Sequence, residues 1–153
     1  MAITSLRRHD RRHQALALVQ KGLRTTPVFD LTGLAETEIR ALFKQIHGRS
    51  PPSGAIPTSA SFCSSRKAQA EVSVLAIIYQ QTQGHQSAND LTGDRLLKAH
   101  ALYQELWLPS GNDPRFDLTD LWVVARDLRT GVMTLPYCER CGLHFAVAFN
   151  QEI

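Results

Sequence analysis

The stretch AETEIRALFKQIHG, residues 35–48, has the clearest structural pattern in the chain. Its apolar residues recur at helical spacing and are Ile39, Leu42, Phe43 and Ile46. This i, i+3, i+4, i+7 repeat predicts an amphipathic helix, and Gly48 suits its carboxyl end. Ala35 stands where an oxygen-bearing N-cap residue is expected, so the start of the helix is predicted to be shifted or weak.

The residues before this helix suggest a helix-turn-helix-like N-terminal part. Residues 10–21 have helical spacing, and residues 28–34 (VFDLTGL) form a short, apolar, turn-like connection. A helix, a glycine-containing turn and a second helix with basic exposed positions is the layout that presents the second helix to the major groove of DNA. Helix pairs joined by short turns are also common in all-α proteins that bind no DNA, so the layout alone favours a purely structural helix pair over DNA binding.

Basic residues crowd the start of the chain. They are Arg7, Arg8, Arg11 and Arg12, together with His9 and His13. Positive charge at the start of a helix is unfavourable against the helix dipole and would gain from an anionic partner. The simpler interpretation, which we favour from the sequence, is a solvated or frayed arm.

Further helices follow a proline-rich connector at residues 49–61. Helical spacing resumes at residues 67–83, 91–106 and 117–129, and Asp117 suits the N-cap of the last segment. The pattern therefore predicts a mainly α fold of about five helices. We expect a helical DNA- or partner-binding domain over residues 1–130, and a small β-hairpin over residues 131–153.

The totals fit a compact globular body. A hydrophobic fraction of 43% with 20% charged residues excludes the disordered and fibrous classes. The formal net charge of +3 permits contact with phosphate without demanding it. We expect a cytoplasmic protein, because the chain has neither an apolar run of membrane-spanning length nor a signal-peptide pattern.

The tail carries a Cys-x-x-Cys motif, Cys138-Glu139-Arg140-Cys141, followed by Gly142. Alternating apolar residues at 132–135 and 143–149 predict short strands on either side of it. Two thiolates three residues apart can bind one tetrahedral Zn²⁺ across a tight turn, and the glycine lets the backbone approach the sulfurs. Cys138 and Cys141 are therefore predicted to be zinc ligands in a zinc knuckle.

The motif leaves the zinc site incomplete. A structural zinc ion needs four ligands, and beyond the two cysteines the tail offers only His144, which we expect to pack against the hairpin instead. A thioredoxin-type redox pair is disfavoured, because that motif caps a helix whereas the residues after Cys141 favour a strand. Cys63 lies alone in a serine-rich stretch and is interpreted as incidental.

Taken together, the connector and the cysteine motif resemble the FlhC family of flagellar transcriptional activators. The resemblance rests on residues 42–57, LFKQIHGRSPPSGAIP, and on residues 121–126, LWVVAR, followed by Gly131 and the cysteine motif. It implies a heteromeric complex with an FlhD-type partner, promoter DNA as the ligand, and no catalysis. Family members have a second Cys-x-x-Cys that completes the zinc site, and the sequence stops before such a pair. We therefore expect either a shortened relative or part of a longer protein.

Five basic residues are predicted DNA contacts from their charge and placement on a helix face or beside the connector, namely Arg40, Lys44, Arg49, Arg66 and Lys67. The alternative is a helical scaffold that binds and modulates an FlhD-type partner without touching DNA. A homo-oligomer within the complex is compatible with both interpretations. An enzyme is disfavoured, because the sequence has no glycine-rich phosphate loop, no His-Glu-x-x-His motif and no nucleophile elbow.

Overall fold

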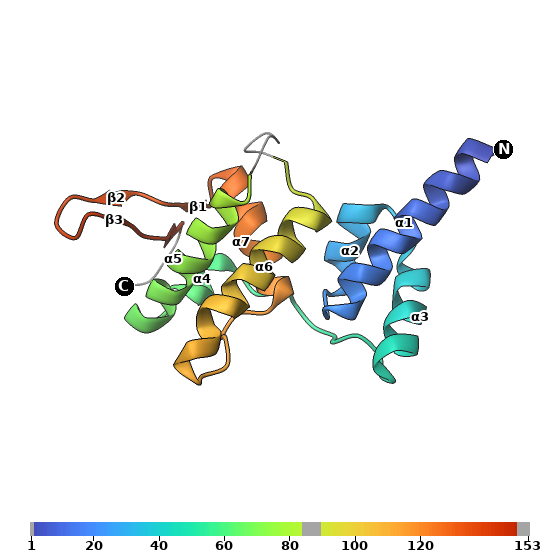
Figure 1. Ribbon diagram of the computed structural model, residues 1–153, viewed down its shortest axis with the longest axis horizontal. Helices are drawn as coiled ribbons and strands as arrows, with labels where there is room; N and C mark the ends of the chain where they lie inside the picture. The colour runs from blue at the N-terminus through green and yellow to red at the C-terminus, as the bar shows by residue number, and fades with distance from the viewer. Residues whose placement is uncertain (1, 84–89, 150–153) are drawn as a thin grey trace. The chain divides into compact units, whose positions relative to one another are not determined.

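The computed structural model describes residues 2–83 and 90–149, which form a mainly helical protein as predicted (Figure 1). The chain divides into two compact units, Met1–Ala55 and Ile56–Ile153. The division falls inside the proline-rich connector expected at residues 49–61. None of the helices in the described ranges has the length and apolar character needed to cross a bilayer.

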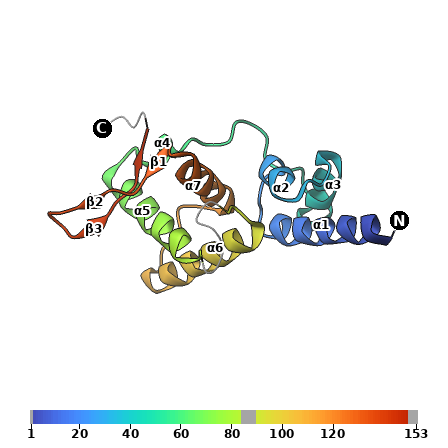
Figure 2. The same cartoon turned by 90° about the horizontal axis from the view of Figure 1, so that it is seen from above.

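The first unit contains three helices that pack on one another, α1 (Ala2–Gln20), α2 (Thr25–Thr32) and α3 (Glu36–His47) (Figures 1 and 2). Each helix contributes to the core of the unit, which includes the fully buried residues Leu18, Val19, Leu23, Val28, Ile39 and Phe43. The imidazole of His47, at the end of α3, hydrogen-bonds the main-chain oxygen of Val19 at 2.7 Å. The predicted amphipathic helix at residues 35–47 is confirmed by α3, and its N-cap Ala35 makes no side-chain capping bond.

The interpretation of residues 28–34 as a turn is wrong, because most of them belong to α2. Proline disfavours a helix interior, but Pro27 lies in the first turn of α2, where a main-chain N–H has no partner within the helix to lose. Gly33 closes α2 with a left-handed φ of 70° and donates its N–H to the Phe29 oxygen at 2.8 Å. The helix pair joined by a tight glycine turn is therefore α2 and α3, and the helix at residues 10–21 is part of the longer α1.

The second unit contains α4 (Ser59–Phe62), α5 (Arg66–Gln81), α6 (Gly93–Trp107), the 3₁₀ turn η1 (Leu108–Ser110) and α7 (Leu118–Thr130). Helices α5, α6 and α7 pack around apolar residues that include Leu75, Leu96, Leu121 and Trp122. Asp117 caps α7 as predicted, because its carboxylate accepts from the Asp120 N–H at 2.9 Å while Asp120 accepts from the Asp117 N–H. The described residues form seven α-helices, more than the expected five, since α2 and α4 fall in segments expected to be a turn and a connector.

The tail forms a narrow hairpin with two strand pairs. Strand β1 (Met133–Thr134) pairs with β4 (Val147–Ala148), and β2 (Tyr137–Cys138) pairs with β3 (Leu143–His144), both antiparallel. The base is held on α5, where Gln69 donates to the Ala146 oxygen at 2.9 Å and the Ser73 hydroxyl accepts from the Ala146 N–H at 2.8 Å. The β2–β3 end extends away from the helices of this unit (Figures 1 and 2).

Candidate nucleic-acid interface

The two units differ in charge. Residues 1–55 contain nine Lys and Arg against four Asp and Glu, a formal net charge of +5. Residues 56–153 contain eight Lys and Arg against ten Asp and Glu, a formal net charge of −2. The small positive total thus hides a strongly basic N-terminal unit, and a polyanion would be attracted to that unit first.

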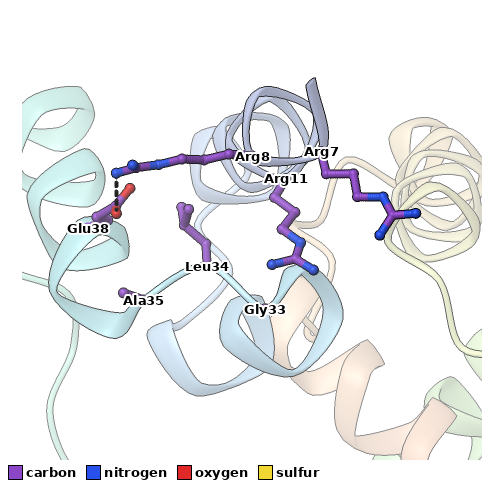
Figure 3. Close-up of a pocket in the computed structure, with 7 residues that line it drawn as sticks. All are labelled: Arg7, Arg8, Arg11, Gly33, Leu34, Ala35 and Glu38. Atoms are coloured by element: carbon purple, nitrogen blue, oxygen red, sulfur yellow. Dashed lines mark hydrogen bonds and ion pairs between the residues drawn. The ribbon is translucent and has the colours of Figure 1, made fainter. Parts of the chain in front are cut away.

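Part of this charge lines a groove in the first unit. The groove has a volume of about 360 Å³ and lies between α1 and the turn from α2 into α3 (Figure 3). Its lining residues are Arg7, Arg8, Arg11, Gly33, Leu34, Ala35 and Glu38. Three guanidinium groups against one carboxylate make it a basic groove.

On one side of the basic groove, the arginine already forms an ion pair. Arg8 reaches across to Glu38 on α3, with a nitrogen–oxygen distance of 3.2 Å (Figure 3). Arg12 lies 3.9 Å from the other oxygen of the same carboxylate. Both arginines are more than half exposed, so these ion pairs contribute little to folding stability.

The other two arginines make no ion pair with the residues that the structure describes. Arg7 and Arg11 stand one helical turn apart on α1, and both are exposed. The guanidinium of Arg11 lies beside Gly33, where an added Cβ would come within 3.9 Å of it (Figure 3). Two cations with this spacing repel each other weakly and are available to an external anion.

The start of α3 adds a further positive feature to the basic groove. Ala35 has no side-chain oxygen, so no side chain satisfies the first main-chain N–H groups of this 12-residue helix. The unsatisfied N–H groups give the helix start a partial positive charge. Glu36 and Glu38 in the first turn offset part of it.

Three of the five predicted DNA contacts lie in the first unit. Arg40 and Lys44 are exposed on α3, one turn apart, and Arg49 is exposed just beyond its end. Arg40 pairs with Glu36 at 3.5 Å, and the Arg49 guanidinium lies 5.8 Å from the Phe43 ring centre. None of the three lines the basic groove.

Arg66 and Lys67 lie in the second unit, at the first turn of α5, and both are exposed. The structure therefore divides the five predicted contacts between a basic unit and an acidic one. It also draws attention to arginines of α1 that were interpreted from the sequence as belonging to a solvated or frayed arm. Their charge was visible in the sequence, but the groove they line depends on how α1 packs against α2 and α3.

The hairpin end brings Cys138 and Cys141 into one tight turn. The Gly142 N–H donates to the Cys138 oxygen at 2.8 Å, and Gly142 adopts a left-handed φ of 70°. Hydrogen bonds from the main-chain N–H and the thiol of Cys141 lower the pKa of the Cys138 thiol below its ordinary value. Cys63 contrasts with it, because burial raises the pKa of its thiol.

This turn holds two thiols, whereas a structural zinc ion takes four ligands. Two thiolates fit two positions of a tetrahedral site. His144 hydrogen-bonds the Leu135 oxygen through Nδ1 at 2.9 Å, and its ring packs 5.3 Å from that of Tyr137. Within residues 2–83 and 90–149, no group of three or more His, Cys, Asp or Glu side chains is placed to hold a metal.

Comparisons with known proteins match this chain over nearly its full length. The model of the family described as "Flagellar transcriptional activator (FlhC)" matches residues 2–152. The flagellar transcriptional regulator FlhC of Paraburkholderia atlantica is 28% identical over 131 residues, which cover 86% of this chain and 60% of the relative. FlhC of Thauera aminoaromatica is 26% identical over 140 residues, covering 92% of this chain and 71% of the relative.

These proteins form a class of transcription regulators and not of enzymes. Because the family match includes almost every residue, the chain belongs to the FlhC family. The matched part covers 60% of the first relative's length and 59% of the length of FlhC from Paraburkholderia phymatum.

Proposed function

We propose that this chain is the DNA-binding subunit of a transcription activator complex that regulates flagellar genes together with an FlhD-type partner. The observation that carries the proposal is the FlhC family match over residues 2–152. The net charge of +5 on the first unit supports it, because neutralising backbone phosphates is the main source of affinity in DNA binding.

Within this function, the first unit is the principal DNA-contacting part. Arg40, Lys44 and Arg49 are exposed and belong to the unit whose net charge attracts DNA. Arg66 and Lys67 have a secondary role, because acidic residues outnumber basic ones in their unit. Charge neutralisation positions the protein on DNA, whereas sequence selection requires contacts to base edges.

The proposal includes a zinc ion at the hairpin. Cys138 and Cys141 would hold two of its four coordination positions, and the remaining ligands would come from outside the described residues or from a partner chain. Bound zinc would fix the hairpin end in one conformation and supply no chemistry.

A second candidate function is a partner-binding scaffold without DNA contact. It is favoured by apolar side chains exposed on the second unit, where Leu102 and Leu106 lie one turn apart on α6 and Leu108 follows in η1. Leu106 is 61% exposed and Leu108 is 76% exposed. Exposed apolar groups of this size suit contact with another protein, whether the FlhD-type partner or a second copy of the chain.

The two functions are separated by measuring DNA binding of the chain alone and with a co-expressed FlhD-type partner. We expect the complex to bind a flagellar promoter fragment in fluorescence anisotropy, with an affinity that falls steeply as salt rises. A complex that forms but binds no DNA at low salt would contradict the proposed function and support the scaffold.

A further inference from the structure

We propose that Arg7 and Arg11 of α1 clamp a phosphate of the DNA backbone in the basic groove beside Gly33. The inference rests on the proposed function and assigns it a contact outside the residues predicted from the sequence. The two guanidinium groups come from successive turns of one helix, and neither forms an ion pair with the described residues.

The geometry of the basic groove suits a phosphate oxygen. The Arg11 guanidinium lies against Gly33, which has no side chain that could cover it (Figure 3). Arginine presents several N–H donors in a planar fork that matches phosphate, and two such forks can contact neighbouring oxygens. The uncapped start of α3 lines the same groove and adds main-chain donors of the kind that bind phosphates elsewhere.

Glu38 determines which arginines take part. Its carboxylate engages Arg8 at 3.2 Å and Arg12 at 3.9 Å, which leaves Arg7 and Arg11 for the external anion. The same carboxylate also repels an approaching phosphate. Glu38 therefore weakens the clamp without abolishing it, and its neutralisation is expected to strengthen DNA binding.

Exposure favours a polyanion over a small phosphate compound as the ligand. All four arginines between residues 7 and 12 are exposed, and Arg8 keeps 74% of its side-chain surface accessible. Exposed cations hold a single small anion weakly in salt. A DNA strand presents successive phosphates and releases condensed counterions when it binds, so the same cations contribute far more.

The test is fluorescence anisotropy with a labelled promoter duplex, using the full chain with its FlhD-type partner at several salt concentrations. We expect the double variant Arg7→Ala, Arg11→Ala to bind about tenfold more weakly, with a salt slope smaller in magnitude by roughly 1 to 2. The control, Lys21→Ala with Arg129→Ala, also loses two exposed positive charges, but neither residue lines the basic groove. It should bind nearly as the unchanged chain does.

Two further variants distinguish direct phosphate contacts by Arg7 and Arg11 from a general electrostatic attraction of the basic unit for DNA. Arg7→Lys with Arg11→Lys keeps the charge but loses the planar fork, and should bind less tightly than the unchanged chain and more tightly than the alanine pair. Glu38→Gln should bind about two- to threefold more tightly, since it frees Arg8 and Arg12 for phosphate. Alanine is a good helix former, so circular dichroism should show α1 intact in the alanine pair.

The outcomes distinguish this inference from the proposed function. If the unchanged complex binds DNA and the Arg7, Arg11 alanine pair matches the control, the clamp is refuted while the proposed function stands. If the unchanged complex binds no DNA, both fail.

Discussion

The hydroxyl of Tyr103 on α6 donates a hydrogen bond to the buried carboxylate of Glu71 on α5. The same Glu71 oxygen accepts from the Arg115 N–H at 2.9 Å, and the Arg115 guanidinium lies 3.3 Å from the other oxygen. The Tyr103 oxygen in turn accepts from the Phe116 N–H at 3.3 Å. A carboxylate is thus held inside the second unit by three donors, and the network ties α5, α6 and the segment before α7 together.

Removing the Tyr103 hydroxyl should destabilise the second unit. Tyr103→Phe leaves the Glu71 carboxylate short of one donor and the Phe116 N–H without its acceptor, which should cost about 1–3 kcal/mol of unfolding free energy. Urea unfolding followed by circular dichroism measures the change. Tyr137→Phe is the matched control, because Tyr137 is 57% exposed. The unfolding free energy of this variant should differ little from that of the unchanged chain. Equal stabilities for the two variants would contradict the role of the network.

Stability should fall as pH rises above about 10. Burial, followed by the hydrogen bond to Glu71, raises the pKa of Tyr103, and burial also raises the pKa of Tyr79. Above pH 10 the unfolded chain releases these protons while the folded chain retains them, so the unfolded state gains stability. Urea midpoints between pH 8 and 11 measure the decline, which should be shallower in Tyr103→Phe. If the urea midpoints of the unchanged chain and of Tyr103→Phe fall equally with pH, Tyr103 does not contribute to the loss of stability.

The two helix starts should respond in opposite ways to cap substitutions. Asp117→Ala removes a capping box from α7 and should lower the unfolding free energy by about 0.5–2 kcal/mol. Ala35→Ser adds a cap to α3 at a position with φ of −58° and ψ of 139°, and should raise stability by up to about 1 kcal/mol. Thermal and urea unfolding measure both changes. A stability loss in Ala35→Ser would contradict the view that α3 lacks only the side-chain cap.

The charge difference between the units predicts unequal effects on DNA binding. Arg40→Ala with Lys44→Ala should weaken binding roughly three- to tenfold, because both residues lie in the basic unit. Arg66→Ala with Lys67→Ala removes the same number of charges from the acidic unit and should cost less. Anisotropy titrations at two salt concentrations compare the pairs. A larger loss for the Arg66, Lys67 pair would place the main DNA contact in the second unit.

Zinc binding should depend on both cysteines of the hairpin. Metal analysis of the purified chain, with and without the FlhD-type partner, should find about one zinc ion per chain in the state that supplies the missing ligands. Cys138→Ser with Cys141→Ser should abolish it, whereas Cys63→Ser should not, since Cys63 is buried away from solvent. Absence of zinc in both states would refute the metal part of the proposed function.

The elements with strong local patterns were predictable from sequence. Helix α3 was predicted within a residue, and the capping role of Asp117 is confirmed. Helix α2 was missed because Pro27 and Gly33 lie only six residues apart and suggested a turn, although each is tolerated at its own end of a short helix. Helix α4 has four residues, too few for an apolar repeat to show.

The basic groove was beyond sequence reasoning for a different reason. Arg11 and Gly33 are 22 positions apart, and only the packing of α1 against α2 and α3 brings them together. The positive charge of residues 7–12 is visible in the sequence, but the groove that three of these residues line is not. The cysteine motif, by contrast, is local, and the tight turn at Cys138 and Cys141 could be predicted from spacing and the following glycine.

We expect the end of the hairpin to open more easily than its base. Its strand pairs contain only two residues per strand, so few backbone hydrogen bonds resist local opening, whereas its base is held on α5 by Gln69 and Ser73. The β2–β3 end can therefore exchange its amide hydrogens through openings that leave the helices closed. A ligand that binds only the closed turn would slow this exchange in proportion to its affinity. The lifetime of the closed turn therefore depends on what binds to it.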